Sequence, residues 1–89
     1  MEPNAQVITL NSMVEPASNS IDRLVGGRVK MRRLSMGLSH ETLAEMIGAT
    51  VSELLQHEKG DSRIDARRLL DISRALDVRA FFFFGNLIA

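Results

Sequence analysis

Two short capped helices, separated by a single glycine, constrain this chain more than any other feature. In the segment Leu38–Gly60, Ser39 and Thr50 each precede a stretch with helical apolar spacing, and Gly48 lies between the two stretches. Serine and threonine are favoured N-cap residues, and glycine is favoured where a helix ends in a left-handed turn. Thr50 to Glu53 also has the Thr-x-x-Glu form of a capping box. We therefore expect two helices joined by a tight turn.

The same signals predict an all-α fold of five helices. The first should begin after Ser20 and run to about Met36, although the Gly26-Gly27 pair weakens it by up to about 1 kcal/mol per glycine and allows a later start. The second follows Ser39 to Ile47, the third follows Thr50 to near His57, the fourth runs from Asp65 to the break at Asp77-Val78, and the last spans Arg79 to Phe84. Inward positions should be Ile21, Leu24, Val25, Val29, Leu34, Leu43, Ala44, Ile47, Leu54, Leu69, Leu70, Ile72, Ala75 and Leu76.

Composition divides the 89 residues into an arm and one domain. Residues 1–19 are rich in Asn, Ser, Pro and Gln and hold both prolines, which predicts a flexible N-terminal arm. Residues 20–89 form the expected folded domain, and 45% hydrophobic residues with 25% charged residues are ordinary globular values. The length leaves no room for a ligand-sensing domain, so we expect none.

The net charge of zero hides an uneven distribution. All 11 basic residues lie from Arg23 onward, whereas Glu2, Glu15 and Asp22 precede it. The rest of the chain therefore has eleven basic residues against eight acidic ones, a net charge of +3. A mildly basic domain is compatible with a polyanionic partner.

The residue types argue against several other classes of protein. Cysteine is absent, and His40 and His57 are the only histidines, so no thiolate nucleophile, metal-ligand pair or Ser/His/Asp set is evident. His57 is best explained as a packing residue. No apolar run approaches the roughly 20 residues of a membrane span. We therefore expect no catalytic site, no metal, no cofactor, no enzyme activity and no membrane association, in a protein of the cytoplasm.

Taken together, these residues resemble the XRE or Cro family of helix-turn-helix domains, which includes the phage 434 and lambda repressors. The resemblance covers about Val25 to Phe84. It is carried by Arg28-Val29-Lys30, Arg33, Gly37-Leu38-Ser39, Leu43-Ala44, Ile47-Gly48, Leu54, Glu58-Lys59-Gly60, Leu69 and Ile72 to Leu76. It implies a lambda-repressor-like domain whose third helix enters the major groove of double-stranded DNA. It also implies a partly buried ion pair between Arg33 and Glu58; the alternative is two solvated charges.

The resemblance places the DNA contacts at the start of the second helix and on the third. The expected contact residues are Ser39, His40, Thr50, Val51, Ser52, Glu53, Leu55, Gln56, Lys59, Arg63 and Arg67, with Arg28 and Lys30 as possible helpers. Gln56 suits adenine, Val51 a thymine methyl, and Ser52 a base or phosphate. Lys59, Arg63 and Arg67 suit phosphates, although a solvated role is an equal alternative for each. His40 stands where the family usually has glutamine and adds pH sensitivity.

Two residues on the third helix depart from a typical DNA reader. Glu53 places an anion near the phosphates, unless the capping box occupies it. Leu55 places an apolar side chain outward, which is also how a helix binds another protein. The alternative class is therefore a protein-binding module, such as an antitoxin or an adaptor subunit.

Four consecutive phenylalanines close the domain. Because successive helical side chains point about 100° apart, Phe81 to Phe84 cannot all face inward. We expect a homodimer interface formed by Phe81, Phe82, Phe84, Leu87 and Ile88; the alternative is that all the aromatics fold onto the same chain. A homodimer would read an inverted repeat, so the expected function is a nucleoid-associated bacterial or phage-type transcriptional regulator, best interpreted as a repressor.

Overall fold

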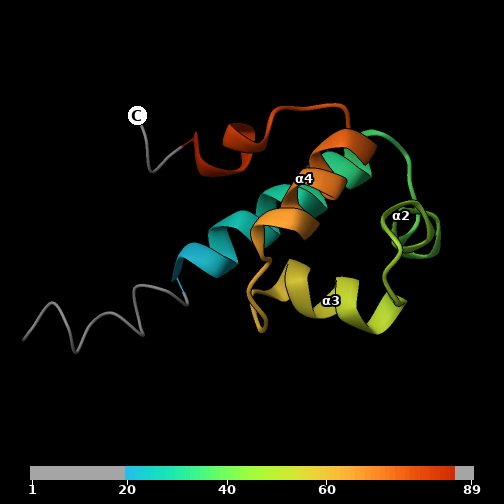
Figure 1. The fold of residues 1–89 in the computed structure, drawn as a ribbon, viewed down its shortest axis with the longest axis horizontal. Helices are drawn as coiled ribbons and strands as arrows, with labels where there is room; N and C mark the ends of the chain where they lie inside the picture. Colours follow the sequence, from blue (N-terminus) through green and yellow to red (C-terminus); the bar gives the residue numbers. More distant parts are fainter. Residues whose placement is uncertain (1–19, 86–89) are drawn as a thin grey trace, which may run out of the picture.

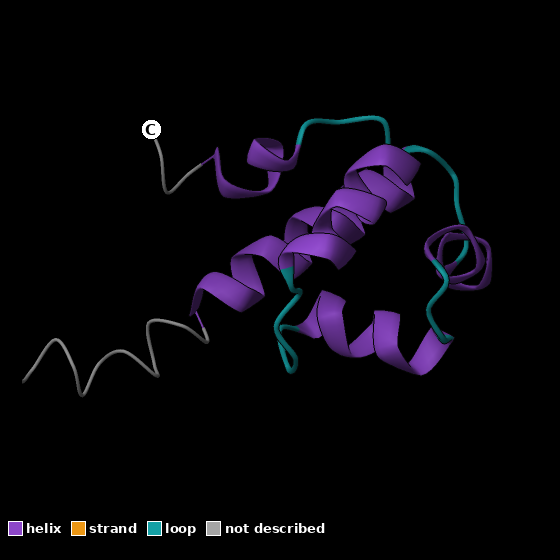
Figure 2. Cartoon of the chain, viewed as in Figure 1, coloured by secondary structure: helices purple, strands orange, loops and turns teal. Residues whose placement is uncertain are grey.

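The computed structural model describes residues 20–85, so the expected N-terminal arm and the expected interface residues Leu87 and Ile88 lie outside the described residues. Within this range the chain forms a first helix over residues 20–35, then α2 (His40–Ile47), α3 (Val51–Lys59), α4 (Ala66–Ala75) and the 3-10 helix η1 (Ala80–Phe84) (Figure 1). Figure 2 shows helices and loops in the described part, and no strand. None of these helices combines the length and apolar character that crossing a bilayer requires.

The α2 helix has the bounds that its capping residues predict. The Ser39 Oγ accepts a hydrogen bond from the backbone N–H of Thr42 at 3.0 Å, which satisfies one of the free donors of the first turn. At the other end Gly48 has φ 71°. A left-handed residue of this kind ends a helix with little strain only when it is glycine. Local sequence therefore fixes both ends of α2.

A complete capping box begins α3. The backbone N–H of Glu53 donates to Thr50 Oγ1 at 3.0 Å, and the backbone N–H of Thr50 donates to Glu53 Oε1 at 2.9 Å. The helix continues to Lys59, beyond the end expected near His57. The physical reason is that the first residue in the left-handed conformation is Gly60, with φ 80°.

The last two elements follow the predicted order with one difference. Asp65 caps α4 through a hydrogen bond from the backbone N–H of Arg68 to Asp65 Oδ1 at 2.8 Å. The α4 helix ends at Ala75, just before the Asp77-Val78 pair where its end was predicted. Asp77 lies in the left-handed region, with φ 56°. The expected last helix, Arg79 to Phe84, is a short 3-10 helix over Ala80–Phe84, so the described residues contain four α-helices and one 3-10 helix.

One apolar core joins all of these elements. In Figure 1, α3 lies along one edge, α4 crosses the first helix, and α2 packs against both α3 and α4. The η1 segment packs against α4. The buried apolar residues are Val25, Val29, Leu43, Ala44, Ile47, Leu54, Ile72, Leu76 and Phe83. Each large side chain in this set stabilises the fold by about 1.5–3 kcal/mol relative to remaining exposed.

Three residues expected in the core lie at the surface. Leu34 is 57% exposed, Leu70 is 45% exposed, and Ile21 is 37% exposed. On the first helix the inward row is Val25, Val29 and Arg33, spaced four residues apart, so Leu34 is turned about 100° away from it. The apolar pattern predicted that Leu34 faces inward. The structure instead buries its neighbour Arg33. On α4, Ile72 and Leu76 define the inward row, and Leu70 lies outside it.

The glycine pair of the first helix proves to have a packing role. The helix runs unbroken through Gly26 and Gly27, so the later start does not occur. A Cβ on Gly26 would lie 2.1 Å from the backbone oxygen of His57, whereas one on Gly27 would meet nothing within 4 Å. Gly60 is equally confined, because its Cβ would lie 2.5–2.7 Å from Arg23 atoms. The end of α3 is thus held against the first helix by two glycines.

Candidate nucleic-acid interface

The α3 helix divides into a buried face and an exposed face. Leu54, His57 and Glu58 are buried, whereas Ser52, Glu53, Gln56 and Lys59 are exposed and Val51 and Leu55 are partly buried. The exposed residues Ser52 and Gln56 are four apart and share one face of the helix. Ser52 and Gln56 are therefore presented outward together, whereas Val51 and Leu55 are less exposed than expected and Val51 packs against the core.

Thr50 and Glu53 are held by each other at the start of α3. Both side chains form the capping-box hydrogen bonds, which is the structural role anticipated for Glu53. The backbone hydrogen bond from Thr50 lowers the pKa of Glu53, and the positive charge of Arg68 acts in the same direction. Arg68 Nη1 lies 3.8 Å from Glu53 Oε1. The anion of Glu53 is thus partly neutralised by the protein itself.

Arg33 and Glu58 meet in a bidentate ion pair beneath α3. Arg33 Nε donates to Glu58 Oε2 at 2.7 Å and Nη2 donates to Oε1 at 3.2 Å, while Nη1 donates to the carbonyl of Leu38 at 2.8 Å. Both side chains are almost fully buried, at 5% and 3% exposure. The pair therefore connects the first helix with α3, and Arg33 also connects both to the turn before α2. Two solvated charges, the alternative, are not what the structure contains.

His40 joins this ion pair, which the sequence did not reveal. Its Nε2 lies 2.9 Å from Glu58 Oε1, and 30% of its side chain is exposed. His40 was expected to contact DNA, yet its Nε2 nitrogen is engaged with Glu58 of the protein. Ser39, its neighbour, is also occupied, since its Oγ accepts from the Thr42 N–H and donates to Thr42 Oγ1 at 3.0 Å.

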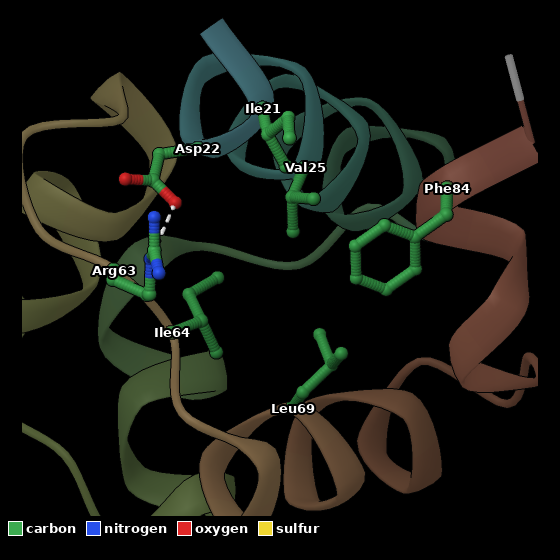
Figure 3. Close-up of a pocket in the computed structure, with 7 residues that line it drawn as sticks. All are labelled: Ile21, Asp22, Val25, Arg63, Ile64, Leu69 and Phe84. Atoms are coloured by element: carbon green, nitrogen blue, oxygen red, sulfur yellow. Dashed lines mark hydrogen bonds and ion pairs between the residues drawn. The ribbon is translucent and has the colours of Figure 1, made fainter. Parts of the chain in front are cut away.

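The expected phosphate contacts differ in how freely they can reach a ligand. Lys59 is exposed at the end of α3. Arg63 Nε donates to Asp22 Oδ1 at 3.2 Å, and Figure 3 shows the guanidinium turned toward that carboxylate. Arg67 Nε lies 3.6 Å from Asp71 Oδ1 on the same helix. Both arginines remain largely exposed, so these weak surface pairs leave most of their donors available.

Two arginines of the first helix hold the C-terminal elements. Arg28 Nη1 donates to the carbonyl of Phe82 at 3.4 Å, and its guanidinium lies 5.5 Å from the centre of the Phe82 ring. Arg32 Nε donates to the carbonyl of Leu76 at 2.9 Å. Arg28, an expected helper in DNA contact, is therefore engaged with η1, whereas Lys30 is exposed.

A polar groove of about 330 Å³ follows the exposed side of α3. It is lined by Glu53, Gln56, His57, Ser62, Arg63, Asp65 and Arg68. The groove adds Arg68 to the candidate residues, which sequence reasoning missed. The available signal was its position in the first turn of α4, three residues after the Asp65 cap. His57 is buried, with Nδ1 3.0 Å from Ser62 Oγ, consistent with the packing role expected of it.

The four phenylalanines have four different environments. Phe83 is fully buried, Phe82 packs edge-on against it at 5.3 Å between ring centres, and Phe81 is 59% exposed. Phe84 is half-buried and lines an apolar pocket of about 300 Å³ with Ile21, Val25, Ile64 and Leu69 (Figure 3). Of the expected interface residues that the structure describes, Phe81 is the one presented most openly.

Metal binding finds no support in the described part of the chain. Residues 20–85 contain no group of three or more His, Asp or Glu side chains arranged to hold an ion. The chemistry available at the exposed face of α3 is that of hydrogen-bond donors, acceptors and cations.

This geometry coincides with a known family. Residues 29–83 match the family profile described as helix-turn-helix, and the chain belongs to this family, of the XRE/Cro type. A relative from Sinorhizobium medicae, named an uncharacterized HTH-type transcriptional regulator, is 44% identical over 68 residues, which cover 76% of this chain and 49% of the relative. A relative from Rhodospirillum rubrum, named an uncharacterized transcriptional regulator in the ATPase CF(0) region, is 43% identical over 67 residues, covering 75% and 62%.

Solved structures agree on the fold. The restriction-modification controller protein C.AhdI from Aeromonas hydrophila superimposes with a TM-score of 0.68 at 30% identity, covering 71% of this chain and 96% of that one. The clp gene regulator ClgR from C. glutamicum gives the same TM-score at 18% identity, covering 75% and 92%, and shows the fold alone. The chain spans about half the length of the Sinorhizobium relative.

Proposed function

We propose that this chain is a transcriptional regulator that binds double-stranded DNA in a sequence-specific manner, with α3 in the major groove. The observation that carries the proposal is the division of α3. Its inner face is fixed by Leu54 and the buried Glu58 pair, while Ser52 and Gln56 are presented outward on one face. A helix presented in this way has the width and the hydrogen-bonding groups that the major groove accepts.

The basic residues supply the second part of the proposal. Four basic residues lie at the end of α3, in the loop after it and at the start of α4. They are Lys59, Arg63, Arg67 and Arg68. Contacts from such residues to phosphates set the register of the protein on the duplex, and side chains on α3 read the bases. Gln56 would bond adenine in a bidentate manner, Ser52 a base or phosphate, and Val51 and Leu55 thymine methyl groups.

We further propose that the regulator acts as a homodimer on an inverted repeat and represses transcription in the bacterial cytoplasm. Phe81 supports the dimer, because a soluble domain gains by covering an aromatic ring that is 59% exposed. Phe82, Phe84, Leu87 and Ile88 complete the proposed interface. Repression is the simplest action of a domain that occupies DNA, because it blocks polymerase. Names of bacterial relatives as transcriptional regulators support this assignment.

Selection of bound duplexes from a random pool tests the proposal directly. We expect an enriched inverted repeat whose affinity falls steeply between low and moderate salt, since phosphate neutralisation releases counterions. Absence of binding to any duplex at low salt would overturn the proposal. That outcome would favour a protein-binding module that uses Val51, Leu55 or Phe81.

Two substitutions separate base reading from phosphate binding. Gln56→Ala should lose about 1–3 kcal/mol of binding free energy at one base pair and relax preference there. Lys59→Ala should weaken all sequences alike and reduce the salt slope by about one. The control is Arg79→Ala, because the connection between α4 and η1 lies at the opposite edge of the domain from α3 (Figure 1). Equal effects of the first two variants on all sequences would contradict the assigned roles.

Molar mass at tens of micromolar tests the dimer. The wild type should sediment as two chains and Phe81→Ser as one. Leu34→Ser is the matched control, because Leu34 is exposed to almost the same extent but lies on the first helix. A wild-type mass of one chain would overturn the dimer without affecting DNA binding by a single domain.

A further inference from the structure

The contact between His40 and the buried carboxylate fixes which ring nitrogen carries a proton. Glu58 accepts two hydrogen bonds from Arg33, and an ionised carboxylate is only an acceptor. The 2.9 Å contact from His40 Nε2 to Glu58 Oε1 therefore requires the proton on Nε2. In the neutral ring Nδ1 then has only a lone pair to offer. Neutral His40 cannot donate to a phosphate through its remaining nitrogen.

The charges around His40 nearly balance without DNA. Glu58 faces it from α3, Arg33 lies behind that carboxylate on the first helix, and Glu41 follows on α2 itself. Arg33 already neutralises Glu58, and the positive end of the α2 dipole opposes a second cation at its first residue. A nearby row of phosphates reverses this balance, because the polyanion favours any added positive charge within about 10 Å.

We propose that His40 takes up a proton when the domain binds DNA, so that operator affinity rises as pH falls. The inference rests on the proposed function and names the regulation of the same face. Protonation leaves the Nε2–Glu58 contact intact and turns Nδ1 from an acceptor into a donor. Histidine is the side chain whose charge changes between about pH 5 and pH 8, so the effect falls near neutral pH. The ring is partly exposed, so solvent can reach it.

The experiment measures dissociation constants for the selected duplex from pH 6 to pH 8 at constant salt. The matched variant is His40→Gln, because glutamine keeps a donor for Glu58 but does not titrate. If binding takes up one proton, the wild-type Kd increases by up to about tenfold for each unit by which the pH rises. We expect the Kd of the variant to change less than about twofold over the whole range. His57 is present in both proteins, so its contribution cancels in the comparison.

Calorimetry supplies a readout that a merely structural role would not move. Titration in two buffers with different ionisation enthalpies should show net proton uptake on binding near pH 7 that is larger for the wild type than for His40→Gln. Binding of both proteins with the same pH dependence would overturn this inference and leave the proposed function intact. Failure of both to bind any duplex at low salt would overturn the proposed function, and this inference with it.

Discussion

The two faces of α3 differ in how strongly the rest of the domain constrains them. The inner face has three kinds of specific constraint, namely apolar packing at Leu54, a bidentate ion pair at Glu58 and glycine-mediated backbone contact at the helix end. The outer face, with Ser52 and Gln56, is exposed. One helix thus carries an inner side that tolerates little change and an outer side that stability hardly constrains.

This separation explains how a small domain can change what it binds without losing its fold. Substitution on the inner face alters stability first, because buried charges and close backbone contacts have no alternative partners. Under the proposed function, substitution at the exposed residues Ser52 and Gln56 should alter recognition and leave packing intact. The experiments below test that division, in decreasing order of expected effect.

The largest effect should follow loss of one partner of the buried ion pair. Glu58→Ala leaves the Arg33 guanidinium buried without its carboxylate, which should reduce the free energy of unfolding by about 3–5 kcal/mol. Urea denaturation followed by circular dichroism measures the loss. Replacement of both partners, in Arg33→Met with Glu58→Leu, should recover most of it, because apolar residues of similar volume need no countercharge. A loss below about 1 kcal/mol for Glu58→Ala would place the pair among solvated surface pairs.

The glycine pair of the first helix gives the next largest effect. Gly26→Ala forces a methyl group into the backbone oxygen of His57, and overpacking of this kind typically costs about 1–3 kcal/mol. Gly27→Ala is the matched control, because its methyl group meets nothing within 4 Å and alanine favours the helix by about 1 kcal/mol. Thermal melts should therefore move in opposite directions. Equal shifts would show that the two helices separate easily.

The capping box should give a smaller effect that depends on pH. Thr50→Ala should lower the free energy of unfolding by about 1 kcal/mol. The Thr50 hydrogen bond lowers the pKa of Glu53 in the folded state, so its stabilising contribution is complete above the unfolded-state pKa and is lost as pH falls through the folded-state pKa. Stability of Glu53→Gln should therefore fall less between neutral and acid pH than that of the wild type, measured by urea denaturation at each pH. Parallel curves for the two proteins would contradict this.

The smallest effect on folding should come from the reading face. Gln56→Ala should change the free energy of unfolding by less than about 0.5 kcal/mol, because the side chain is exposed. The same variant should lose sequence preference in the binding experiment. A folding loss comparable to that of Thr50→Ala would show that the outer face also supports the structure, and the division between faces would fail.

Local chemistry made α2 and α3 predictable. Ser39, Gly48, Thr50 and Glu53 determine where these helices begin and where the turn lies, since capping depends on residues within one turn of each other. Periodicity also placed Leu43, Ala44, Ile47 and Leu54 in the core. It failed for Leu34, because an apolar pattern cannot show that a neighbouring arginine is buried when its carboxylate partner lies 25 residues further along the chain.

The sequence by itself determined the helix caps, the family and the exposure of Ser52 and Gln56, because caps and helical periodicity depend on residues close together in the chain. Only the tertiary structure decided that His40 shares the buried carboxylate of Glu58 and that Arg28 is engaged with Phe82. It alone showed that Gly26 is a contact point and Gly27 is not. These properties depend on which distant segments meet and at what angle, and close packing turns differences of a few ångströms between them into different roles for adjacent residues.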